Sequence, residues 1–152
     1  MTNDGLRHAT LTFERLFDAP VDRVFTAFAD PVARAAWGTP SDTAAFFYEE
    51  ANFRIGGRDV FRCGDKADPQ YRGVTTYLDI VPNERIVSSE IVEHAGTRLL
   101  ISLSTATFAP APAGTKLLVT VQATSLAGDD MIRGAEFGHR ASLDNLVAAM
   151  KE

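Results

Sequence analysis

The sequence is poor in metal-binding and redox-active side chains, with one cysteine and three histidines. The lone Cys63 cannot form an intramolecular disulfide, and a multi-cysteine metal site is excluded as well. His8, His94 and His139 are scattered and show no HxH or HxxxH spacing, so neither a metal site nor a cofactor is predicted. A chain of this kind suits a reducing compartment, and we expect a cytoplasmic location.

An excess of positive charge and a long apolar run are also missing. The formal net charge is -5, which provides no basic surface for nucleic acid. No stretch approaches the roughly 20 apolar residues that cross a bilayer, and the N-terminus lacks the apolar segment of a secretory signal. The phosphate-binding motifs GxGxxG and GxxxxGK and the nucleophilic-serine motif GxSxG do not occur either. Nucleic acid and membranes are therefore not expected partners.

What the chain does contain is enough hydrophobic sequence, 45% of 152 residues, for a single domain spanning residues 1–152. Residues 8–17 alternate between apolar and polar side chains and predict a strand. Two short helices are predicted next, over residues 21–28 and 32–37. Asp18 is expected to cap the first helix, and Asp30 with Pro31 begins the second.

From residue 44 onward the pattern is that of about six consecutive strands joined by short turns. Gly56-Gly57 is interpreted as a hairpin turn, because no phosphate-binding motif surrounds it. Short connections between successive strands are typical of an antiparallel meander. The predicted strands are 44–54, 58–63, 70–81, 85–94, 98–109 and 115–124.

Residues 129–151 form the only long helical pattern, so this helix must cover the sheet. The resulting fold class is α+β. Leu143 is the centre of the helix's apolar stripe, whose C-terminal part is made of Leu146, Val147 and Met150. Its first half carries Glu136 and His139, which is unusual for a helix that only fills a core. Gly134 and Gly138 weaken the pattern, so we expect a late start or a bend there.

Several short motifs together resemble the activator of heat-shock protein 90 ATPase homologue-like family, within the START-like (SRPBCC) superfamily. The resemblance implies a helix-grip fold, in which a curved antiparallel sheet of six to seven strands wraps the C-terminal helix. It also implies a cavity between the sheet, that helix and the two short helices. The motifs are Phe17-Asp18-Ala19-Pro20, Asp30-Pro31, Arg54-Ile55-Gly56-Gly57-Arg58, Tyr71-Arg72-Gly73, Ile80-Val81-Pro82-Asn83-Glu84-Arg85-Ile86, Gly138 and Ser142-Leu143-Asp144-Asn145-Leu146.

The chain departs from the family pattern at two places. Ala36-Trp37 stands where relatives usually have a tryptophan pair, and His139 stands where they usually have a tryptophan after the helix glycine. If these positions line the cavity, its mouth should be wider and more polar, so the ligand of a relative cannot be transferred to this chain.

Aromatic side chains concentrate around the second helix and the first hairpin, where about half can face a cavity because strand neighbours alternate. For Glu136 and His139 three interpretations stay open: a hydrogen-bonded polar pair at an exposed helix start, groups that orient a ligand without chemistry, or an acid and base that share a proton over a ligand. No catalytic residue is assigned. The predicted ligand-binding residues are Trp37, Tyr48, Phe53, Phe61, Tyr71, Tyr77, Ile132, Glu136, His139 and Leu143.

The leading functional hypothesis is a protein that binds an apolar or aromatic small molecule in this cavity. One alternative is an enzyme of the cyclase or aromatase type found elsewhere in the superfamily. Another is a protein-interaction domain that regulates a chaperone ATPase, for which the sequence offers no further support. Homodimerisation is expected from the fold type, and Phe137, which lies off the apolar stripe, is a candidate for a partner surface.

Overall fold

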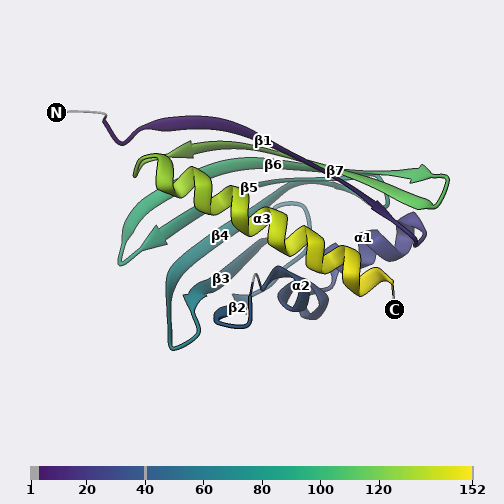
Figure 1. Cartoon of the computed structure of the whole chain (residues 1–152), viewed down its shortest axis with the longest axis horizontal. Coiled ribbons are helices and arrows are strands. Elements are labelled where there is room, and N and C mark those ends of the chain that lie inside the picture. The colour runs from purple at the N-terminus through teal and green to yellow at the C-terminus, as the bar shows by residue number, and fades with distance from the viewer. Residues whose placement is uncertain (1–3, 40, 152) are drawn as a thin grey trace.

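The computed structural model describes residues 4–39 and 41–151, which form seven strands and three helices (Figure 1). The sheet order is β1-β7-β6-β5-β4-β3-β2, and every neighbouring pair is antiparallel. The elements are β1 (Arg7–Phe17), α1 (Val21–Ala29), α2 (Pro31–Gly38), β2 (Ala44–Glu50), β3 (Arg58–Asp65), β4 (Asp68–Val81), β5 (Arg85–His94), β6 (Thr97–Ala111), β7 (Gly114–Ser125) and α3 (Asp129–Met150).

The sheet is curved, and α3 runs diagonally across its concave side, with α1 and α2 near the C-terminal half of α3 (Figure 1). The predicted α+β architecture, with one long covering helix, is confirmed. Among the described residues, no helix combines the length and the apolar character that crossing a membrane would require.

The main core lies between the sheet, chiefly β1, β6 and β7, and the helices α1 and α3 that pack on it. The side chains of Leu117 and Leu146 are completely buried, and Phe17 and Val121 are 1% exposed. Arg15, which interrupts the apolar side of β1, donates to Asp144 of α3 at 3.0 Å. The C-terminal half of α3 is therefore held to the sheet by both packing and an ion pair.

The end of α2 is tied to α3 by side chains of the family-like motif. Ser142 donates to the carbonyl of Gly38 at 3.0 Å, and Asn145 donates to the carbonyls of Trp37 and Thr39 at 3.3 and 2.8 Å. These bonds satisfy carbonyl groups that a helix end leaves free. They fix α2 beside the middle of α3.

Local structure differs from the sequence prediction at several boundaries. The first short helix begins after Pro20 with no side-chain cap, so the expected Asp18 cap does not form, whereas Asp30 does accept from the Val32 amide at 3.0 Å. The second strand ends at Glu50 instead of residue 54, because the Asn52 amide turns to donate to Asp59.

The loop predicted between residues 63 and 70 is shorter than expected. Strand β3 continues to Asp65, and β4 already begins at Asp68. Gly56 has φ +82°, as the predicted turn requires. Helix α3 is continuous from Asp129, so the late start considered at its glycines is wrong. Burial of its apolar stripe outweighs a helix-propensity loss of about 1 kcal/mol per glycine.

Candidate functional site

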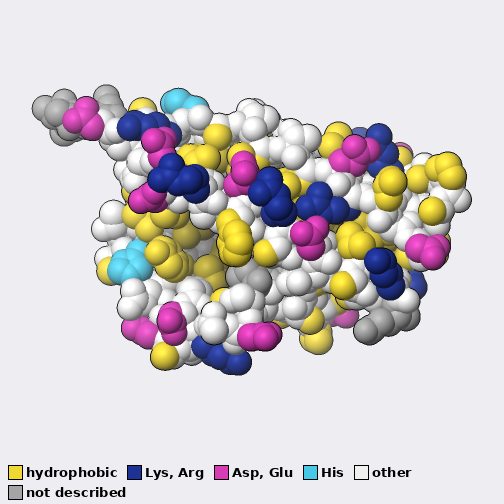
Figure 2. Space-filling model, in the orientation of Figure 1, with side chains coloured by type: hydrophobic (Ala, Val, Ile, Leu, Met, Phe, Trp, Pro, Cys, Tyr) yellow, Lys and Arg dark blue, Asp and Glu magenta, His cyan; other side chains and the backbone are white. Residues whose placement is uncertain are grey.

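Between the sheet and α3 lies a cavity made of two adjoining compartments. The inner compartment, beside α2, has a volume of about 230 Å³, and the outer compartment, under the N-terminal half of α3, has a volume of about 490 Å³. In Figure 2 the molecule is hollowed below this half of α3, and hydrophobic side chains line the hollow. Six residues line both compartments and form their shared border: Gly38, Phe46, Phe61, Glu90, His139 and Ser142.

The space exists because the side chains that face it are small. On α3 the outer compartment is lined by Gly134, Ala135 and Gly138, which lie on one face of the helix. A Cβ atom added at Gly134 or Gly138 would meet nothing within 4 Å. Opposite, Ser102 and Ser104 of β6 occupy inward positions that large apolar residues fill in a packed core.

The structure brings most of the predicted ligand-binding residues to this cavity. Trp37, Tyr48, Phe53, Tyr77 and Leu143 line the inner compartment, and Tyr71 lines the outer one. Phe61 and His139 belong to the shared border. The remaining two, Ile132 and Glu136, line neither compartment in the described part of the chain.

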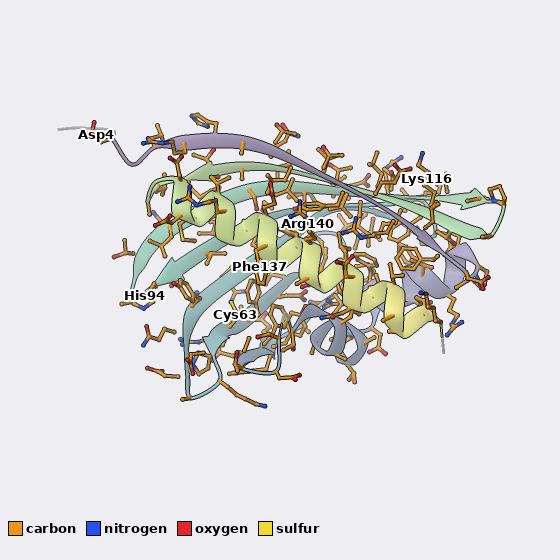
Figure 3. All side chains as sticks on the ribbon, in the orientation of Figure 1. Asp4, Cys63, His94, Lys116, Phe137 and Arg140 are labelled. Carbon is orange, nitrogen blue, oxygen red and sulfur yellow. The ribbon has the colours of Figure 1, made fainter. Side chains whose placement is uncertain are left out.

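Glu136 lies on the solvent side of α3, where its side chain is 44% exposed and accepts from Arg140 at 3.3 Å. Its neighbours Phe137 and Arg140 project away from the sheet (Figure 3). Ile132 packs against the core instead. Glu136 and His139 thus point in different directions, and no hydrogen bond joins them in residues 4–39 and 41–151. Neither the hydrogen-bonded pair nor the acid and base pair considered for Glu136 and His139 is therefore present.

His139 faces the cavity from α3, and its ring lies 5.7 Å from the Phe13 ring of β1. It has no hydrogen-bond partner among the described residues. Burial lowers the pKa of His139 below its ordinary value, so the imidazole is neutral at pH 7. A neutral imidazole can both donate and accept one hydrogen bond, and both capacities remain available to a bound molecule.

One wall of the inner compartment is a buried ionic cluster that the sequence reasoning missed. Arg34 of α2 is 7% exposed and Asp59 of β3 is 2% exposed, and their side chains meet at 2.9 Å. Tyr77 donates to the same Asp59 oxygen at 2.5 Å, and Arg34 donates to the Tyr48 hydroxyl at 3.1 Å. We call Arg34, Tyr48, Asp59 and Tyr77 the Asp59 cluster.

Further hydrogen bonds engage the charged pair at the centre of the Asp59 cluster. The second Asp59 oxygen accepts from the Asn52 amide at 3.0 Å, and Arg34 also donates to the Phe28 carbonyl at 2.6 Å. Burial raises the pKa of Tyr77 and Tyr48, so both phenols stay protonated. Tyr77 keeps its donor role toward Asp59, whereas the Tyr48 hydroxyl accepts from Arg34. The cluster therefore has little capacity left for a ligand.

Glu90 of β5, which the sequence reasoning also missed, is the opposite case. It lies on the shared border, directly between Thr75 of β4 and Ser102 of β6 in the strand register. It has no hydrogen-bond or ion-pair partner in the described part of the chain. Burial raises the pKa of its carboxyl to about 7. The sequence did indicate Glu90, as a charged residue at a strand position that can face inward. It did not show which face of β5 is the inward one, because both faces carry apolar residues.

Cys63 lines the outer compartment, on β3 beneath α3 (Figure 3). Burial, with the nearby Glu90 carboxyl, raises the pKa of the thiol to about 11, so it is not a nucleophile at neutral pH. Over the described ranges, no three His, Cys, Asp or Glu side chains converge in a way that could hold a metal ion.

Comparison with known proteins places the chain in a family. The family model described as Activator of Hsp90 ATPase homolog 1-like protein matches residues 18–151. The chain belongs to this family. The predicted family membership and helix-grip fold are confirmed. No curated protein matches the chain.

Three solved structures are similar to this chain over nearly its whole length. A protein of Rhizobium loti is 35% identical, with 95% of this chain and 98% of that chain covered and a TM-score of 0.82. A protein of Rhizobium leguminosarum is 32% identical, with 97% of each chain covered and a TM-score of 0.82. A protein of Chromobacterium violaceum, 29% identical over 94% and 97% of the two chains, has a TM-score of 0.80.

Proposed function

We propose that this member of the family binds a small, mainly apolar molecule in the cavity between the sheet and α3. Glu90 and His139 are the polar groups that orient the molecule. The observation that carries the proposal is their lack of partners: two ionisable side chains face the same cavity and have no hydrogen-bond partner among the described residues. Both side chains are only partly buried and open to the cavity, so a molecule bound there can supply the hydrogen bonds that the protein does not.

The apolar part of the molecule would lie against aromatic rings. Phe46 and Phe61, both at the shared border, stack with their centroids 5.0 Å apart. Tyr48 meets Phe46 edge to face at 5.3 Å. Rings fixed in this way present a rigid apolar wall, and burial against such a wall supplies most of the affinity for a small ligand.

Native mass spectrometry of the purified protein tests the proposal, together with titration of the fluorescent apolar probe N-phenyl-1-naphthylamine. We expect a retained small molecule, probe binding, or both. Gly138→Trp fills the outer compartment and should abolish binding. Phe137→Trp is the matched control, because residue 137 is next to Gly138 but 66% exposed. Its binding should equal that of the unchanged protein.

The same experiment can reject the proposal. If Gly138→Trp folds, as judged by circular dichroism, and still binds the probe as well as Phe137→Trp does, the cavity is not the binding site. Absence of both a retained molecule and probe binding in the unchanged protein would also overturn it.

A second candidate function is proton transfer in a reaction of the cyclase or aromatase type. Glu90 favours it, because a carboxyl in an apolar cavity with a pKa of about 7 suits a general base at neutral pH. The probe 5-nitrobenzisoxazole, which loses its C3 proton as its N–O bond breaks, would reveal such a base. Turnover that is the same in Glu90→Gln as in the unchanged protein would remove Glu90 from this role.

Homodimerisation and a chaperone partner remain predictions. Size-exclusion chromatography with light scattering would test the first, and a chaperone ATPase assay with the purified protein would test the second.

A further inference from the structure

The chemistry around Glu90 defines the ligand more closely than apolar character alone, if the proposed binding function holds. Glu90 belongs to the border between the two compartments, so a group that contacts it can carry substituents into both. Its direct cross-strand neighbours are Thr75 and Ser102, and neither forms a hydrogen bond with its carboxyl in the described part of the chain. Any strong partner must come from the bound molecule.

An ionised carboxylate only accepts hydrogen bonds, so the missing partner is a donor. Arg34, which also lines the inner compartment, is already engaged by Asp59, Tyr48 and the Phe28 carbonyl. It cannot neutralise Glu90 as well. A bound anion would face this unpaired carboxylate, and a purely apolar molecule would leave it unsatisfied.

The aromatic border favours a cation independently of Glu90. The stacked Phe46 and Phe61 rings line both compartments beside the carboxylate. The negative faces of aromatic rings attract organic cations. His139, on the opposite wall, is neutral and does not repel positive charge.

We infer that the cavity selects a weak organic base: a molecule with an aromatic or aliphatic body and a protonated amine that donates to Glu90 at the shared border. The charge-assisted hydrogen bond fixes the amine, and the two compartments take the apolar substituents on either side. Affinity for such a cation increases with pH through the titration of Glu90, because only the ionised carboxylate pairs with it.

Other titratable groups around Glu90 do not reverse this pH dependence. Tyr48 on β2 and Cys63 on β3 stay protonated, since burial raises the pKa of each. His139 on α3 becomes a cation only in acid, which weakens amine binding in the same direction. Asp130, at the edge of the outer compartment, is exposed and paired with Arg133 of the same helix, so it adds little to the charge around Glu90.

Competition with N-phenyl-1-naphthylamine at pH 8 tests the inference. Three ligands share one ring system: 1-naphthylmethylamine, 1-naphthalenemethanol and 1-naphthoic acid. We expect the amine to bind at least about tenfold more tightly than the alcohol, and the acid to bind most weakly. Glu90→Gln should remove the amine's advantage over the alcohol. Glu93→Gln, on the same strand but paired with Arg72, should retain it.

The outcomes separate this inference from the proposed function. If the probe and the alcohol bind but the amine is no better than the alcohol, the binding function stands and the inference is wrong. The same conclusion follows if Glu90→Gln keeps the amine's advantage. If neither the probe nor any naphthalene compound binds, the proposed function fails, and the inference fails with it.

Discussion

Two sets of ionisable side chains face the same cavity, and they differ in what surrounds them. In the Asp59 cluster, Asp59 has three hydrogen-bond partners within the protein: Arg34, Tyr77 and the Asn52 amide. Glu90 and His139, which we call the Glu90 pair, have none among the described residues. The comparison separates two roles: the saturated cluster belongs to the scaffold, whereas the unsaturated pair is free to interact with a ligand.

The energetic consequences of the two arrangements should be opposite. Removing one member of a buried, well-bonded ion pair leaves the other charge uncompensated and destabilises the fold. Removing the charge of a buried group that has no partner relieves a desolvation cost instead. Substitutions in the two sets should therefore change stability with opposite sign.

The largest expected effect is that of Asp59→Ala. The substitution leaves Arg34 buried without its carboxylate, so the free energy of unfolding should fall by about 3–5 kcal/mol in urea denaturation. Glu49→Ala is the control, since Glu49 pairs with Arg62 at 3.4 Å near the surface. Glu49→Ala should lower the free energy of unfolding by less than about 1 kcal/mol. Equal losses in the two variants would show that the Asp59 cluster is no part of the scaffold.

The next largest expected effect is a pH-dependent gain in the free energy of unfolding, caused by Glu90→Gln. The pKa of Glu90 is about 7 in the folded protein and 4.5 as the ordinary value, so the folded state holds its proton more tightly. The stability that this difference in pKa contributes is fully present below pH 4.5 and is lost as the pH rises through 7. Above pH 7, Glu90→Gln should raise the free energy of unfolding by roughly 2–3 kcal/mol.

Denaturation series between pH 4 and pH 8 measure this gain. Glu93→Gln on the same strand should follow the pH profile of the unchanged protein, apart from the small loss of its ion pair with Arg72. A parallel shift of the Glu90→Gln curve at all pH values would mean that Glu90 is not the titrating group.

A smaller gain in the stability of the fold is expected from His139→Phe. The new ring can pack on Phe13 and removes an imidazole that has no hydrogen-bond partner in the described part of the chain, which should stabilise the fold by about 1 kcal/mol at pH 7. Because burial lowers the pKa of His139, stability is lost as the pH falls below its ordinary value, and the variant should lack this loss. Thermal unfolding at pH 5 and pH 8 measures both effects. A destabilised variant would indicate an unrecognised partner of His139.

The sequence allowed the fold to be predicted because its periodicities are local. Alternation and turn residues define β1 and β7, and the stripe around Leu143 defines the covering face of α3. The Asp59 cluster could not be predicted, since Arg34 and Asp59 meet only after α2 has folded onto β3. Glu90 was missed for a related reason: the two faces of β5 are similarly apolar, and the inward one is chosen by the curvature of the whole sheet.

The emptiness around the Glu90 pair can be tested by the smallest change, Gly138→Ala. In the middle of a helix this substitution adds about 0.5–1 kcal/mol of stability, provided that the new methyl group finds room. At Gly138 it does, because a Cβ meets nothing within 4 Å. At Gly73 a Cβ would overlap the Phe61 ring, so Gly73→Ala should destabilise the protein. Urea denaturation of both variants shows whether each substitution raises or lowers the free energy of unfolding. A loss of stability in Gly138→Ala would place α3 against the sheet and close the space on which the contrast between the two sets depends.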